Sequence, residues 1–162
     1  MFRLNIIVEA FVGDRKYEYK HVKLIVKFES LEENEVKPVR TKTALNKLIE
    51  AVGIPVTYYH STDHVRERIL HRWISLCFEK YAELMEIFTS HDAVVVEFKE
   101  PIAARDLWNI KKRLPDLGVT LWKAIREWAL QCSREWSIDG KFHAYSFIPM
   151  VGGNQDEDST KS

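Results

Sequence analysis

Residues His60 to Asp92, HSTDHVRERILHRWISLCFEKYAELMEIFTSHD, contain the longest helical pattern of the sequence. At roughly 100° per residue, the apolar side chains of this stretch fall in one arc of about 120°, the width of a stripe that faces a core. They are Ile69, Leu70, Trp73, Leu76, Cys77, Leu84, Ile87 and Phe88. The pattern therefore predicts one long amphipathic helix, for which Ser61, Thr62 and Asp63 are suitable N-caps.

The sequence before this helix predicts a β-hairpin. Residues 2 to 12 are rich in Leu, Ile, Val and Phe, residues 13 to 16 break the run, and residues 17 to 29 alternate between apolar and polar. Two such runs joined by a short turn are typical of paired antiparallel strands. In the second strand Val22, Leu24, Val26 and Phe28 share one face, which is therefore expected to pack.

Local start and stop signals predict the remaining elements. We expect at most a short edge strand in residues 30–40, a helix from Thr41 or Thr43 to Gly53, strands at 54–59, 93–99 and 141–151, and two helices separated by residues 114–118. The two final helices are expected to pack as a hairpin with Trp108, Trp122 and Trp128 in the core. Their layout also resembles a helix-turn-helix, in which Lys111, Lys112 and Arg113 would contact phosphates.

These elements predict an α+β fold. We expect a single domain over residues 1–151, with an antiparallel or mixed sheet, the N-terminal β-hairpin, one long amphipathic helix and a C-terminal helical pair. Residues 152–162 are small, polar and acidic, which predicts a disordered tail.

Charge and composition restrict the functional classes. The chain has 24 basic and 24 acidic residues, so its overall charge does not by itself predict nucleic-acid binding, although a local basic patch could provide it. The two cysteines, Cys77 and Cys132, lie in apolar helix faces and are expected to be reduced. We expect no signal peptide and no membrane span, which favours a cytoplasmic protein.

The first turns of the predicted long helix carry the residues most suited to binding. The predicted phosphate-binding set consists of His60, His64, Arg68, His71 and Arg72. A helix N-terminus attracts anions, and nearby cations would add charge-assisted hydrogen bonds. The leading interpretation is a small soluble binding protein that contacts nucleic acid, a protein partner or another copy of itself through this face. The alternative is an ordinary solvated helix face, and no cofactor is expected.

A metal site is not expected at these histidines. His60 and His64 are four residues apart, a spacing that serves zinc when both residues are helical. The capping residues between them place His60 outside the helix, and the sequence contains neither HExxH nor paired CxxC.

Two short resemblances provide an enzymatic alternative, namely cleavage of phosphodiesters. HDAVVVEFKEP resembles the end of the catalytic motif of restriction-endonuclease-like nucleases, which implies Asp92 and Glu97 as Mg²⁺ ligands and Lys99 as a charge-stabilising residue. Asp92 and Glu97 are closer in sequence than in that family, and a helix precedes them where a hairpin is expected. An amphipathic strand explains the same residues.

The second resemblance is to the two-histidine phosphoesterases. His60-Ser61-Thr62 is similar to one His-x-Thr/Ser element of that family, which implies a catalytic pair of His60 and His143. The second element departs from the pattern because Tyr145 stands where Thr or Ser is expected.

Overall fold

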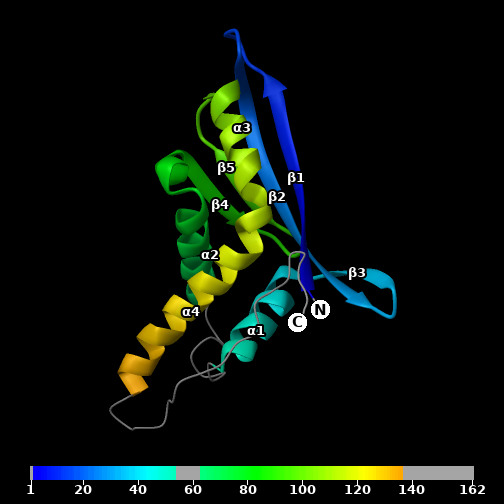
Figure 1. The fold of residues 1–162 in the computed structure, drawn as a ribbon, viewed down its shortest axis with the longest axis vertical. Helices are drawn as coiled ribbons and strands as arrows, with labels where there is room; N and C mark the ends of the chain where they lie inside the picture. The colour runs from blue at the N-terminus through cyan, green and yellow to red at the C-terminus, as the bar shows by residue number, and fades with distance from the viewer. Residues whose placement is uncertain (1, 54–62, 137–162) are drawn as a thin grey trace.

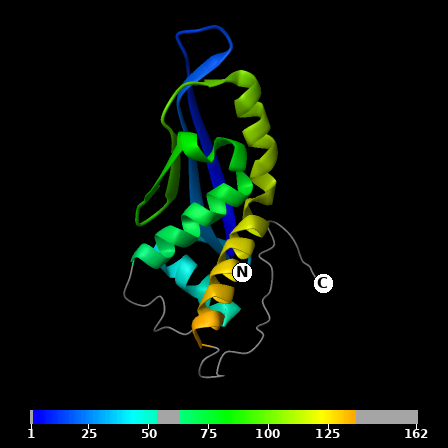
Figure 2. The ribbon, with the colours of Figure 1, turned by 90° about the vertical axis from the view of Figure 1, so that its left-hand side faces the viewer.

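The computed structural model describes residues 2–53 and 63–136, with only the backbone described at 63–65 and 131–136. It confirms the α+β fold. The antiparallel sheet has the core order β1-β2-β5-β4, and two shorter strands, β3 and β6, also pair with β2. Figures 1 and 2 show helices α3 and α4 along one face of this sheet, with α1 and α2 beside them. No helix among the described residues is long and apolar enough to span a membrane.

The predicted N-terminal hairpin is confirmed. Strands β1 (Phe2–Val12) and β2 (Glu18–Glu32) pair in register from Phe2 opposite Ser30 to Glu9 opposite Lys23, with an irregularity between Glu9 and Phe11. Alternate residues of β2 are buried because successive side chains of a strand point to opposite faces. The buried residues include Val22, Leu24, Val26 and Phe28, as the sequence predicts.

The first helix has the expected bounds. After strand β3 (Glu35–Val39), α1 (Thr41–Val52) begins at Thr41 and buries Leu45, Leu48, Ile49 and Val52. Gly53 ends it in the left-handed conformation at φ 92°, where its N–H bonds to the carbonyl of Glu50. Glycine adopts this conformation without the steric cost of a Cβ.

The prediction of one long helix through residues 60–92 is wrong in its second half. Helix α2 (Asp63–Cys77) is followed by a 3-10 helix, η2 (Glu79–Leu84), and then by strand β4 (Met85–Thr89). Leu84 and Phe88, predicted to face the core, are 37% and 49% exposed. Along MEIFT buried or partly buried residues alternate with exposed ones up to Phe88, and pairing of β4 with β5 (Val94–Phe98) satisfies the backbone groups that the two strands turn toward each other.

The first half of that prediction holds, and α2 packs closely against α4 (Leu117–Trp136). Ile69, Leu70 and Trp73 are buried on the face that the periodicity predicts. The indole Nε1 of Trp73 donates a hydrogen bond to the carbonyl of Leu117 at 2.7 Å. Burial of a tryptophan with its polar atom satisfied fixes the end of α2 against the start of α4.

The two C-terminal helices exist, but their predicted packing as a hairpin is wrong. Strand β6 (Ile102–Ala103) leads into α3 (Ala104–Arg113), which continues through a 3-10 turn, η3 (Leu114–Asp116), into α4. Leu114 and Leu117 keep right-handed helical backbone angles, so the chain does not reverse, as Figures 1 and 2 show. The helix-turn-helix layout fails for the same reason, because it requires two helices that cross.

Because α3 and α4 do not form a hairpin, the tryptophans of these two helices differ in exposure. Trp122 and Trp128 are buried, as expected, whereas Trp108 is 60% exposed because no second helix folds back over α3. The predicted strands at 54–59 and 141–151 and the predicted tail at 152–162 lie outside the described residues.

Candidate functional site

The structure brings three of the five predicted binding residues to one groove. Arg68, His71 and Arg72 lie on α2 and line a groove of about 650 Å³ between α2 and α4. Its other wall includes Glu127 and Trp128 of α4. His64 belongs to α2, but its side chain is outside the described part, as is the whole of His60.

Arg72 already has an acidic partner within the molecule. Its Nε donates a hydrogen bond to Oε2 of Glu127, 55 residues further along the chain. This hydrogen bond, assisted by the negative charge of Glu127, raises the pKa of Arg72 above its ordinary value. Arg72 therefore joins α2 to α4. Of the described residues that line this groove, Arg68 and His71 are the other exposed basic residues and could contact a ligand.

Arg66 has a similarly structural position. It is buried, and its guanidinium donates to the Oδ1 atom of Asn46 in α1 at 3.2 Å. A buried cation needs hydrogen-bond partners to offset the loss of water. Of the arginines in α2, Arg68 therefore has the position best suited to an external ligand.

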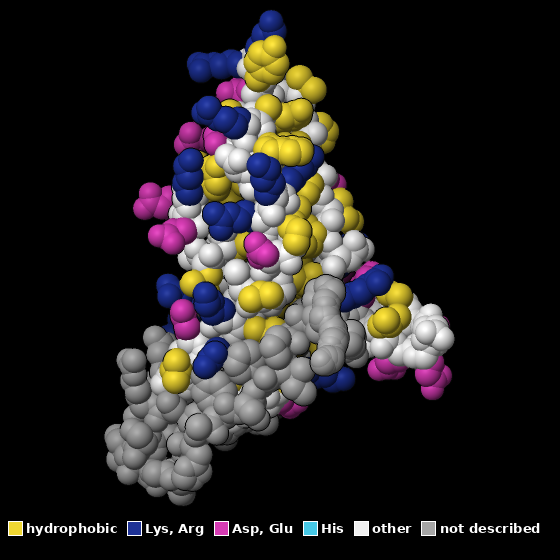
Figure 3. All heavy atoms as spheres, viewed as in Figure 1, with side chains coloured by type: hydrophobic (Ala, Val, Ile, Leu, Met, Phe, Trp, Pro, Cys, Tyr) yellow, Lys and Arg dark blue, Asp and Glu magenta, His cyan; other side chains and the backbone are white. Residues whose placement is uncertain are grey.

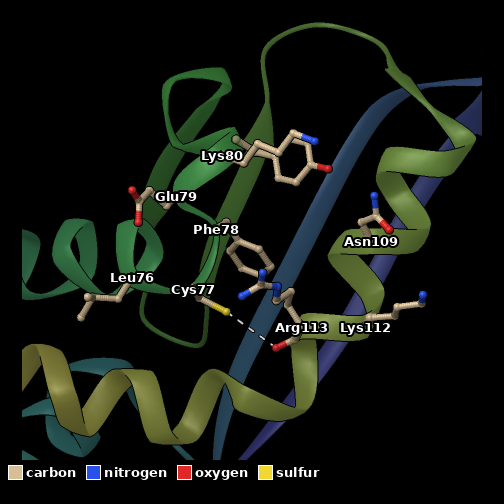
Figure 4. Close-up of a pocket in the computed structure, with 9 residues that line it drawn as sticks. Leu76, Cys77, Phe78, Glu79, Lys80, Asn109, Lys112 and Arg113 are labelled. Carbon is tan, nitrogen blue, oxygen red and sulfur yellow. Dashed lines mark hydrogen bonds between the residues drawn. The ribbon is translucent and has the colours of Figure 1, made fainter.

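A second groove, of about 700 Å³, lies between the end of α2, η2 and α3. Lys80, Lys112 and Arg113 line it, with Glu79 as an acidic lining residue. Figure 4 shows Arg113 extending from the end of α3 toward Phe78. The two grooves follow one another along α2, because Ser75 lines the first and Leu76 lines the second.

An exposed aromatic side chain lies beside this second groove. The Nζ of Lys112 is 5.5 Å from the centre of the Trp108 ring, within the range of a cation–π interaction. Arg105, Trp108 and Lys112 have a spacing that places them along one face of α3. Figure 3 shows basic and apolar side chains interspersed on the upper part of the molecule, where α3 lies.

Nearby acidic groups only partly offset these cations. Asp106 accepts a hydrogen bond from the Tyr81 hydroxyl at 3.1 Å, which connects α3 to η2. The Tyr81 ring also lies 5.7 Å from Lys80 Nζ. The last turn of α3 carries Lys111, Lys112 and Arg113, whose charges are favourable at the negative end of the helix dipole. The groove thus combines Lys80, Lys112 and Arg113 with the rings of Phe78 and Tyr81, and Trp108 lies beside Lys112.

Cys77 lines the second groove and has the properties of a structural thiol. It is buried, and its Sγ lies 3.6 Å from the carbonyl of Arg113. Burial raises its pKa to about 11, so the thiol stays protonated near neutral pH. A protonated, buried thiol is a poor nucleophile, and the groove is therefore better suited to binding than to thiol catalysis.

The residues of the nuclease-like motif are not brought together. Asp92 lies in a bend before β5, and Glu97 lies near the far end of that strand, so the two residues are at opposite ends of β5. Glu97 instead pairs with Lys23 of β2 at 3.4 Å. In the described ranges, 2–53 and 63–136, no group of three or more His, Cys, Asp or Glu could hold a metal ion. The proposed pair of His60 and His143 lies outside these ranges.

Comparisons with protein-family models, curated proteins and solved structures found no match. The functional interpretation therefore depends on the geometry. The predicted set did not include Lys80, Lys112 or Arg113, which line the second groove. The basic run Lys111-Lys112-Arg113 is the sequence signal for that groove, but the sequence pattern predicts Trp108 in the core and residues 79–84 in the long helix, and the structure shows neither.

Proposed function

We propose that this protein is a non-enzymatic binding protein for single-stranded nucleic acid, with the groove between α2 and α3 as its main contact surface. The observation that supports this proposal most strongly is the exposed Trp108 beside Lys112, which itself lines the groove together with Arg113 and Lys80. Proteins that bind single strands combine cations along the phosphate backbone with aromatic rings on which bases stack. Trp108 supplies such a ring, and the three cations supply phosphate contacts.

The groove between α2 and α4 extends this proposed surface. Arg68 and His71 lie on the same helix that forms one wall of the groove between α2 and α3. A strand that crosses from one groove to the other would pass along α2. The protein is neutral overall, so its affinity depends on local charge and is expected to fall steeply with salt.

Salt-dependent binding tests this proposal. A labelled single-stranded oligonucleotide of about 12 residues is titrated with the protein by fluorescence anisotropy at several salt concentrations. We expect the double variant Lys112→Ala/Arg113→Ala to bind more weakly, and its slope of log affinity against log salt to fall by about 1.4, because two phosphate contacts are lost. Absent or salt-independent binding of the unaltered protein would contradict the proposal.

A matched control removes two lysines elsewhere. Lys27→Ala/Lys37→Ala changes the net charge equally, but both residues are exposed on strands β2 and β3 of the sheet. This variant should retain the affinity, and an equal loss in both variants would indicate nonspecific attraction. The oligonucleotide should also be recovered intact after incubation with Mg²⁺. Its cleavage would favour the enzymatic alternative.

A further inference from the structure

Among the described residues, strand β1 forms a long edge of the sheet. It has 11 residues, and in the described part of the chain it pairs only with β2. Figure 1 shows it along the outer side of the sheet. The unpaired N–H and C=O groups of such an edge are a template for another strand.

This edge has few of the usual features that prevent pairing, namely Arg3, Glu9 and an irregularity between Glu9 and Phe11. Phe2–Val12 contains no Pro, Lys or Gly, and its pairing with β2 is regular from Phe2 to Glu9. Strand β3, in contrast, contains Lys37 and Pro38, and β4 has only five residues. Charged residues, prolines and short length are common means of protecting an edge.

The side chains along β1 also remain partly uncovered. Leu4, Ile6 and Val8 point toward the core but are only half-buried, and Ile7 on the opposite face is exposed. Figure 3 shows apolar side chains along the side where β1 runs. A strand added at this edge would cover them and satisfy the backbone groups together.

The charges of β1 indicate a second copy of the chain as the occupant. We propose that two copies associate by antiparallel pairing of their β1 strands, with a two-fold axis at Ile6. Arg3 of each copy then lies opposite Glu9 of the other, and opposite charges in such positions attract. Glu9 has no ion pair within the described residues, and Arg3 contacts Glu29 through its Nε, which leaves its other N–H groups for Glu9.

Other registers do not pair these charges. Residues directly opposite each other in a sheet share a face, so the axis must pass through a residue and not between two. With the axis at Ile7, Arg3 would face Phe11, and with the axis at Asn5 it would face Ile7. The register at Ile6 also places Leu4 beside Val8 of the other copy, so the half-buried aliphatic rows become continuous.

The association has a geometric consequence. A two-fold axis perpendicular to the sheet keeps each face of the sheet on its own side. The two sheets would become one continuous sheet, and the helices of both copies would cover the same face. The opposite face, which carries Ile7 and Ile25, would remain free.

Mass measurement by light scattering on the full chain tests the proposal. We expect a mass of twice 19.1 kDa for the unaltered protein at micromolar concentration. Glu9→Arg places like charges opposite each other at both ends of the interface and should give a monomer, whereas Arg3→Glu/Glu9→Arg should restore the dimer. The control Glu86→Arg makes the same change on β4 and should remain a dimer.

Disulfide trapping tests the register without relying on charge. In a Cys132→Ala background, Ile6→Cys should form a disulfide-linked dimer on oxidation, because residue 6 faces its own symmetry mate. Val8→Cys should not, because its neighbour is residue 4. A monomeric full chain would overturn the proposal, as would cross-linking through Val8→Cys alone. A monomer whose β1 amides are protected from hydrogen exchange would assign the edge to another occupant and would also overturn it.

Discussion

The two grooves along α2 are similar in size and in residue types, but they use their charges and tryptophans differently. In the groove between α2 and α4, Arg72 is bonded to Glu127 and Trp128 is only 8% exposed. The groove between α2 and α3 is lined by Lys112 and Arg113, and the exposed Trp108 lies beside Lys112. The side chains of the first groove mainly hold two helices together. The second groove has cations that face solvent and an exposed aromatic ring beside it.

This difference shows why the number of cations in a helix is a weak guide to binding. Arg66, Arg68 and Arg72 lie within two turns of α2, yet two of them have acceptors inside the molecule. A charge with an internal partner stabilises packing and contributes less to an external contact. If this distinction is correct, matched substitutions in the two grooves should affect different properties.

The largest effect is expected from Trp128→Ala. Truncating a buried aromatic ring leaves a cavity and typically costs about 3–5 kcal/mol of the free energy of unfolding. Urea denaturation should show this loss, whereas Trp108→Ala should change stability by no more than about 0.5 kcal/mol because the ring is already exposed. Equal losses for both variants would remove the distinction between the two grooves.

Trp108→Ala should instead weaken binding of the oligonucleotide. Loss of a base–aromatic stacking contact costs about 1–3 kcal/mol of binding free energy, which anisotropy titration would detect. Val119→Ala is the control, because Val119 of α4 is equally exposed but is not an aromatic residue beside a lysine of the groove. An unchanged affinity for Trp108→Ala would show that bases do not stack there.

Glu127→Gln should have a smaller effect on stability. The Arg72–Glu127 pair is partly exposed, and such pairs contribute about 0–1 kcal/mol to the free energy of unfolding. Glu67→Gln is the control because Glu67 is an exposed residue of α2 for which the described structure gives no ion pair. Thermal unfolding should therefore show a lower midpoint for Glu127→Gln than for Glu67→Gln. The reverse order would contradict a joining role for Arg72.

The smallest expected effect at neutral pH is that of the Cys77 thiol, whose ionisation changes stability and reactivity only in alkaline solution. Its pKa is raised by burial to about 11, whereas the unfolded thiol ionises near 9.0. Any stability from this shift is fully present below pH 9 and is lost as the pH rises from 9 to 11, because the unfolded state releases its proton first. In a Cys132→Ala background, alkylation by iodoacetamide should be slow at pH 8 and should accelerate toward pH 11. A rate that levels off near pH 9 would contradict the raised pKa.

Sequence patterns predicted the elements whose signals were local. Strands β1 and β2 have a period of two on both sides of a turn, and α1 has a helical period that ends at Gly53. The buried face of α2 follows from the same reasoning, since Ile69 and Leu70 precede Trp73 by about one helical turn. In these regions local periodicity and tertiary packing agree.

Other features depended on partners far away in the sequence. The stretch MEIFT fits a helix or a strand, and only its pairing with β5 makes it β4. The exposure of Trp108 depended on the direction in which α4 leaves α3, and the bond of Arg72 to Glu127 spans 55 residues. No local period carries such information, so the sequence shows the basic run Lys111-Lys112-Arg113 but not the groove that Lys112 and Arg113 line.

The most direct test of the proposed binding surface compares the tryptophans within one experiment. Indole N–H signals of ¹⁵N-labelled protein are assigned with single Trp→Phe variants and followed as an unlabelled single-stranded oligonucleotide is added. We predict that the signal of Trp108 shifts progressively, while that of the buried Trp73, which is bonded to the carbonyl of Leu117, stays in place. No shift at Trp108 under low-salt conditions would contradict the central claim.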